Sequence, residues 1–322
     1  MNKTYIYALL KSAWSNIVNR EELLQMLNTQ DLTSATRSII NKPIGTVLYE
    51  VVSKKTFSLN ELDYRLTSFN NERIMSIYSK ISGKERKLID NLNTIFDTIN
   101  LYYIALFIQN GKRASVIYPI GRLSNIELSN INNFDSLRNI IPIDLVKTLD
   151  LILSTNIVDL TNLITIFSNL KPITEDLSVK RVLSFIRDSV LIKTCLLIKQ
   201  LPATGLSVLT MYLSDFENIC NLRDLKTLPQ ILHSLNPLYA GFSELLNDIF
   251  SIKCSFELLD LAIMLYSLNI SSDLINNLER VVLRTYLLYL SETMIIRMIL
   301  SLIDSNMYID RFRDIVSKWW PL

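Results

Sequence analysis

Apolar residues recur at steps of three and four through most of the chain, which is the pattern of amphipathic helices. The stretch after Ser82 shows it most clearly, with Leu88, Ile89, Leu92, Ile95, Phe96, Ile99, Tyr103 and Leu106 on one face. This spacing predicts a helix of about 25 residues. Asn110-Gly111 and the basic pair that follows predict its C-terminus.

Several tetrapeptides predict where helices begin. Ser58–Glu61, Ser82–Glu85 and Ser124–Glu127 match the capping box, in which the first side chain and the glutamate each bond to the other's backbone amide. Asn19–Glu22 is a looser version of the same pattern. Each precedes an apolar run, so we expect four helix N-termini.

The last residues predict a docked terminal helix. One face carries Tyr308, Phe312, Ile315, Val316 and Trp319, and charged residues take the other face. The adjacent Trp319 and Trp320 are expected to close the core, with a partner anchor as the alternative.

Glycine content indicates the fold class. Only six of 322 residues are glycine, about 2%, where about 7% is average. Glycine supplies the positive-φ positions of hairpins and phosphate loops, so its scarcity disfavours β-barrels and nucleotide-binding α/β folds. We expect an all-α fold.

Hydropathy raises the question of a membrane span. The chain is 49% hydrophobic and its mean hydropathy is +0.25. A spanning helix needs about 20 mostly apolar residues. The best runs are interrupted by charge: VLIKTCLLIK carries two lysines, FELLDLAIMLYSLNI two acids and LERVVLRTYLLYLSE two arginines. The N-terminus shows no signal-peptide pattern. We expect a non-spanning protein whose apolar surplus is buried against partners.

Composition offers little for catalysis or for nucleic-acid binding. Lys and Arg total 33 against 31 Asp and Glu, so no basic excess favours nucleic acid. His233 is the single histidine and is interpreted as structural, while Cys195, Cys220 and Cys254 are interpreted as reduced core residues. The Gly-Lys pairs at Gly83 and Gly111 lack the rest of a phosphate loop. We assign no catalytic, cofactor-binding or metal-binding residue, no cofactor and no small-molecule substrate, and expect a chain that is not itself an enzyme.

Three predicted helices share a local pattern in an apolar surround: a polar or acidic residue, and three positions later a residue that is followed by an aliphatic one. The positions are Asp97, Asn100 and Leu101; Asn218, Asn221, Leu222 and Arg223; and Glu292, Ile295, Ile296 and Arg297. The pattern suggests a long-period repeat, and three ordinary amphipathic helices are the simpler alternative.

The order of these motifs resembles the C subunit of archaeal and bacterial A/V-type rotary ATPases, which is related to the eukaryotic d subunit. The resemblance covers essentially the whole chain. It includes YIYALLKSAW, the Asp97–Leu101 helix with its Asn-Gly-Lys-Arg turn, IYPIGRLS (117–124), which is similar to a Pro-x-Gly-x-Leu element, and the closing helix with Glu292 and Arg297. The chain departs from the family at Ala8–Lys11, around TRSIINKPIG and at Tyr102, as a divergent member would.

The resemblance implies three similar helical subdomains around a pseudo-threefold axis, forming a funnel, with approximate boundaries 1–130, 131–235 and 236–322. It implies a central-stalk rotor adapter on the cytoplasmic face of the cell membrane. Its partners would be the central shaft subunits and the membrane proteolipid ring, and it would transmit torque between ATP chemistry and proton or sodium translocation. Asn100 and Asn221 would be interior hydrogen-bonding residues, with a shaft contact as the alternative.

Two other functions remain open at this level. One is a soluble α-helical interaction scaffold unrelated to ATPases, which would favour helix pairs of uniform period. The other is a helical enzyme that uses carboxylates, although no Asp-Asp-x-x-Asp run occurs.

Overall fold

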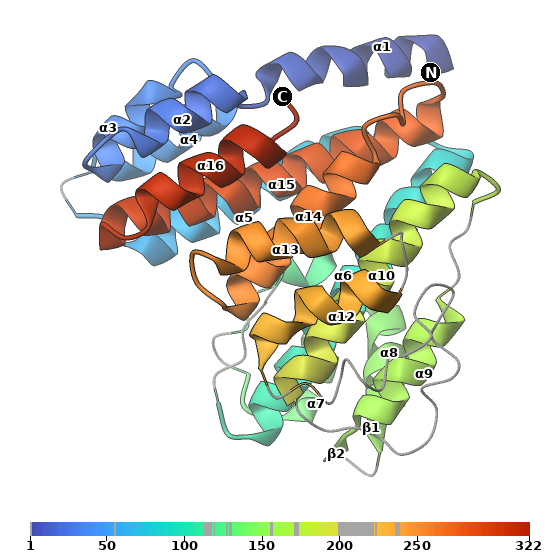
Figure 1. The fold of residues 1–322 in the computed structure, drawn as a ribbon. Coiled ribbons are helices and arrows are strands. Elements are labelled where there is room, and N and C mark those ends of the chain that lie inside the picture. Colours follow the sequence, from blue (N-terminus) through green and yellow to red (C-terminus); the bar gives the residue numbers. More distant parts are fainter. Residues whose placement is uncertain are drawn as a thin grey trace.

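The computed structural model describes residues 2–54, 56–112, 118, 120–126, 128, 131–154, 157–170, 174–198, 222, 224–235 and 239–322. In this part of the chain the all-α prediction is confirmed (Figure 1). The exception is one antiparallel pair of two-residue strands, β1 (Leu153–Ser154) and β2 (Ile157–Val158).

Most of the helices are short, and a few are long. In the first half they are α1 (Lys3–Ala13), η1 (Trp14–Asn16), α2 (Arg20–Leu27), α3 (Leu32–Ser38), α4 (Pro43–Val52), α5 (Leu59–Tyr78), α6 (Gly83–Gln109), η2 (Arg122–Asn125), α7 (Phe134–Ile140) and α8 (Ile143–Ile152). In the second half they are α9 (Leu160–Asn169), α10 (Leu177–Ile198), η4 (Leu225–Thr227), α12 (Leu228–Leu235), α13 (Ala240–Phe250), α14 (Phe256–Ile270), α15 (Leu278–Ser305) and α16 (Ile309–Trp319).

The long helix predicted after Ser82 is α6, with 27 residues. It ends at the expected Asn-Gly pair. Gly111 has a φ of +63°, its amide bonds to the carbonyl of Ile108 at 3.0 Å, and the amide of Lys112 bonds to that of Phe107 at 2.8 Å. These two bonds form a Schellman motif, which satisfies carbonyl groups at the helix end.

The capping-box predictions are confirmed only in part. At Asn19–Glu22 both reciprocal bonds are present, and the Ser58 hydroxyl accepts from the amide of Glu61 at 3.1 Å. Ser82 occupies the N-cap of α6 without a side-chain bond to the helix. The helix predicted to start at Ser124 is wrong, because this residue lies inside the short η2.

Helix α15 forms the centre of the upper layer in Figure 1, where α14, α5, α1 and α6 pack around it. In the described part of the chain it is the one helix long and apolar enough to cross a membrane, and 83% of its apolar window is buried within the protein. The expectation that no run reaches this length and hydropathy was therefore wrong for α15. Its neighbours cover its apolar surface.

The terminal helix α16 docks as predicted, with Phe312, Ile315 and Val316 buried. Trp320 is also buried, which supports its interpretation as part of the core. Tyr308 does not join this face: it is 40% exposed and takes a φ of +59° at the N-cap.

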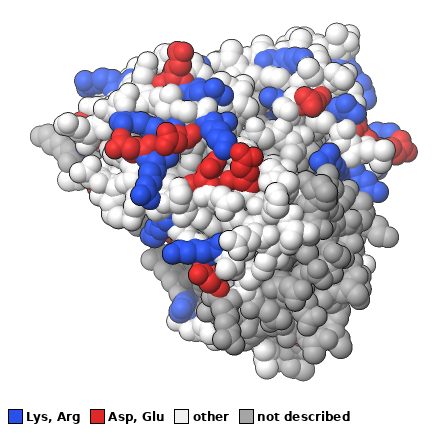
Figure 2. Space-filling view, viewed as in Figure 1, with Lys and Arg blue, Asp and Glu red and all other residues white. Residues whose placement is uncertain are grey.

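The predicted subdomain boundaries and the funnel remain predictions. Helices of the first and third predicted segments share one layer, since α15 packs against α1, α5 and α6, and α10 of the second segment packs against α14. On the face shown in Figure 2, acidic and basic side chains of the described residues lie next to one another.

Candidate functional site

The motif residues of α6 point into the protein and hold the chain segment that follows this helix. Asp97, Asn100 and Leu101 are all fully buried. Since a buried polar group is costly unless it is hydrogen-bonded, the partners of Asp97 and Asn100 define what the motif does.

Asn100 binds the backbone on both sides of position 119. Its Oδ1 accepts from the amide of Tyr118 at 2.8 Å, and its Nδ2 donates to the carbonyl oxygens of Tyr118 at 3.0 Å and Ile120 at 3.4 Å. The Asn100 side chain thus bonds to backbone amide and carbonyl groups of this segment, as a neighbouring β-strand would. The prediction that Asn100 is an interior hydrogen-bonding residue is confirmed.

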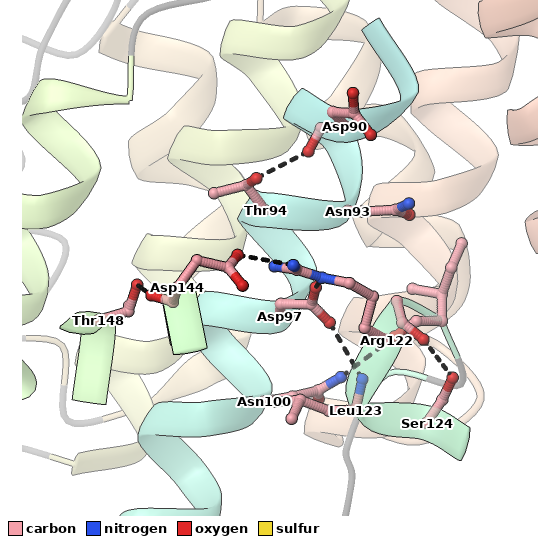
Figure 3. A network of polar contacts seen from close by, with 12 residues as sticks. Asp90, Asn93, Thr94, Asp97, Asn100, Arg122, Leu123, Ser124, Asp144 and Thr148 are labelled. Carbon is pink, nitrogen blue, oxygen red and sulfur yellow. Dashed lines mark hydrogen bonds and ion pairs between the residues drawn. The ribbon is translucent and has the colours of Figure 1, made fainter. Parts of the chain in front are cut away.

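Asp97 holds the next turn of the same segment, as Figure 3 shows. Its Oδ2 accepts from the Nε of Arg122 at 2.9 Å, and its Oδ1 accepts from the amide of Leu123 at 3.3 Å. Burial raises the pKa of Asp97 above its ordinary value, and Arg122 opposes that rise. Gly121, with a φ of +88°, brings the backbone against this carboxylate.

Arg122 extends the network to α8. Its guanidinium also donates to Asp144 at 2.6 Å. Burial acts to raise the pKa of Asp144, but the hydrogen bond and charge of Arg122 outweigh it and lower that pKa below its ordinary value. One arginine therefore connects α6, η2 and α8, and we call Asp97, Asn100, Gly121 and Arg122 the α6 clamp.

The corresponding acid of α15 holds the N-terminal part of the chain. Glu292 is fully buried; it accepts from the amide of Val18 at 2.7 Å and from Arg73 of α5 at 2.5 Å. The carbonyl of Val18 accepts from the indole of Trp320 at 3.0 Å. Both backbone groups of Val18 are thus fixed by side chains from the C-terminal end of the chain.

The remaining motif positions have different environments. Ile295 and Ile296 are buried, whereas Arg297 is partly exposed and pairs with Asp63 of α5. Leu222 is partly buried. Asn218, Asn221 and Arg223 lie outside the described residues, as do Glu127 and Cys220.

The other candidate residues of the sequence occupy ordinary positions. His233 is exposed on α12. Cys254 is a free thiol that is only partly buried, so its assignment to the core was wrong. The side chain of Cys195 is outside the described part of α10.

A second interior cluster was missed by sequence reasoning. Tyr118, Lys193 and Asp260 meet through a hydrogen bond and an ion pair. Lys193 is 67 positions from Asp260 along the chain, and Tyr118 is 142 positions from it. No local pattern connects residues at such distances.

The chemistry of the α6 clamp is that of structural anchoring. The oxygens of Asp97 and the amide of Asn100 are occupied by backbone groups and by Arg122. Among the described residues, no group of three or more His, Cys, Asp or Glu side chains could hold a metal ion. Comparison of the chain with protein-family models and with curated proteins finds no match.

Proposed function

We propose that this chain is the central-stalk rotor adapter of an A/V-type ATP synthase or ATPase. It would lie peripherally on the cytoplasmic face of the cell membrane, bind the central shaft subunits and the proteolipid ring, and transmit torque between them. The proposal rests on the resemblance found in the sequence. The observation that carries it is the α6 clamp.

The clamp supports the resemblance because it is a contact between two of the motifs on which the resemblance is based. The resemblance pairs an Asp-x-x-Asn-Leu helix with a Pro-x-Gly-x-Leu element about 20 residues later. Asn100 and Asp97 of the first motif bind the backbone at Tyr118, Ile120 and Leu123, in the IYPIGRLS segment that contains the second. Motifs that bond to each other explain why a divergent chain retains both.

The build of the protein also suits a coupling element. Torque transmission requires stiffness, and α6 and α15 are continuous helices of 27 and 28 residues. Both are wrapped by other helices along most of their length. Buried Asp97 of α6 fixes the segment that follows this helix, and buried Glu292 of α15 fixes the segment between η1 and α2.

The test is isolation of the complex and measurement of coupling. A tagged copy of the chain, extracted from its own host membranes in mild detergent, is expected to carry shaft subunits and proteolipid with it. Complexes that lack the chain are expected to hydrolyse ATP without pumping ions, and added chain restores pumping.

Two results would overturn the proposal. One is a fully coupled rotary complex, purified from the same membranes, that lacks this chain. The other is recovery of the tagged chain with neither shaft nor proteolipid, which would favour the interaction scaffold.

A further inference from the structure

Three side chains from distant segments meet in the interior. Tyr118 follows α6, Lys193 lies on α10 and Asp260 lies on α14. The phenol of Tyr118 donates to one carboxylate oxygen of Asp260 at 2.6 Å, and the ammonium of Lys193 donates to the other. The same ammonium lies 5.1 Å from the centre of the Tyr118 ring. Each of the three predicted repeats contributes one member of this cluster.

The cluster is buried, with exposures of 1% for Tyr118, 3% for Lys193 and 7% for Asp260. A buried ion pair adds little net stability, because desolvation offsets the attraction between its charges. Separating its members inside the protein is costly, since each charge then lacks a partner. The charges can therefore separate only where water replaces the lost contact.

Such water access exists beside the cluster. A groove of about 420 Å³ reaches both charged residues, and its walls include Phe256, Met294, Arg297 and Met298. The groove lies between α14 and α15. A small movement of α14 and α10 away from the segment after α6 would hydrate Lys193 and Asp260 from this side.

The contacts around the cluster define which parts would move together. Helices α10 and α14 pack closely along their lengths, whereas α10 and α6 meet at few positions. One of these is a long polar contact of 3.5 Å between the hydroxyls of Tyr103 and Thr194. The Tyr118–Asp260 bond and this contact are polar links between the α10–α14 pair and α6 with its following segment.

We propose that Tyr118, Lys193 and Asp260 form a latch that holds the α10–α14 pair against the segment after α6. The latch is closed in this structure. Its release lets water from the groove reach Lys193 and Asp260 while α5 and α16 stay folded. This inference does not depend on the proposed function.

The amine of Lys193 is a native probe of the latch. We would measure its acetylation by an N-hydroxysuccinimide ester, mapped by mass spectrometry, in the Tyr118→Phe variant. This change removes one hydroxyl and leaves the Lys193–Asp260 pair. Because a hydrogen bond to a charged group contributes about 1.5–3 kcal/mol, the modification rate of Lys193 is expected to rise about tenfold or more.

Two internal references separate latch release from general destabilisation. Lys42 pairs with Glu22 far from the groove and is only 13% exposed in its side chain, so its rate follows unfolding elsewhere and is expected to stay unchanged. Tyr286→Phe is the matched control, since this buried hydroxyl donates to Asn93 at 3.0 Å. It is expected to leave the Lys193 rate unchanged.

The latch is rejected if Tyr118→Phe changes the Lys193 rate by less than about twofold, or raises Lys193 and Lys42 equally. A second measurement needs no variant. In the unaltered protein, urea below the unfolding transition is expected to expose Lys193 before Lys42. Rates that rise together would mean that only global unfolding frees Lys193.

Discussion

Gly121 lies against the carboxylate of Asp97 with no space for a side chain between them. A Cβ atom at position 121 would stand 2.2 Å from the Oδ1 of Asp97, which is shorter than any van der Waals contact. The glycine also takes a φ of +88°, a conformation that other residues adopt only with strain. Close approach and backbone conformation both require glycine here.

Gly121→Ala is therefore expected to lower the free energy of unfolding by at least about 2 kcal/mol. Urea denaturation followed by circular dichroism measures it. Gly111→Ala is the matched control, because Gly111 has a φ of +63° but no atom within 4 Å of its added Cβ. It is expected to cost about 1 kcal/mol, the conformational part alone. Equal losses of unfolding free energy in both variants would show that the steric conflict with Asp97 adds nothing to the cost of Gly121→Ala.

Asn100→Asp tests the bonds to the segment after α6. The change replaces a donor that faces the carbonyls of Tyr118 and Ile120 by an acceptor, in a fully buried site. We expect a loss of roughly 3 kcal/mol or more in unfolding free energy. Exposed Asn110 donates from its Nδ2 to the carbonyl of Leu106 at 2.8 Å, and there the same change is expected to cost only about 1 kcal/mol. A tolerated Asn100→Asp would contradict the clamp.

Two ion pairs on α15 are expected to differ in strength because they differ in burial. Glu292 and Arg73 have side-chain exposures of 0% and 14%, whereas Asp63 and Arg297 have 36% and 40%. A double-mutant cycle with Glu292→Gln and Arg73→Met is expected to give a coupling energy of about 2–3 kcal/mol. The cycle with Asp63→Asn and Arg297→Met is expected to give less than about 1 kcal/mol. The reverse order would contradict this assignment.

The sequence predicted the helices well where local chemistry decides them. The apolar period and the Asn-Gly stop of α6 need no tertiary information. Ser124–Glu127 failed because the Ser124 hydroxyl serves other partners: it donates to the carbonyl of Gly121 at 2.6 Å and accepts from Asn71 at 2.7 Å. A tetrapeptide cannot show that its cap oxygen is already used.

Only the α6 side chains of the candidate site were predictable from the sequence. The polar positions Asp97 and Asn100 in an apolar stripe indicate interior hydrogen bonds. Their partners come after the turn at Gly111, and no local pattern in the sequence shows that this later segment returns to α6. The contact between Tyr118 and Asp260 spans 142 positions. Such pairs arise from how helices pack, and a single chain offers no periodic signal for them.

The pH dependence of stability is expected to reveal Asp188 on α10. This residue is 3% exposed and accepts from Arg187 at 2.9 Å. Burial raises the pKa of Asp188 to about 6, although Arg187 acts to lower it. An unfolded aspartate has a pKa of about 3.9, so between about pH 4 and 6 the native state keeps a proton that the unfolded chain has released. The free energy of unfolding therefore falls as the pH rises through this window, by on the order of 2–3 kcal/mol.

Asp188→Asn is expected to remove that fall, and urea midpoints at about pH 4.5 and 6.5 in the two proteins measure it. Asp176→Asn is the opposite control. Burial acts to raise the pKa of Asp176, but the hydrogen bonds from Arg280 and Asn277 and the charge of Arg280 together lower it to about 2. Its contribution to stability is present above about pH 4 and is lost as the pH falls towards 2. This variant should therefore lower stability equally at pH 4.5 and 6.5 and change the pH slope only in the acid limb. A fall between pH 4 and 6 that is as large in Asp188→Asn as in the unaltered protein would assign it to another carboxyl group with a raised pKa, such as Asp97.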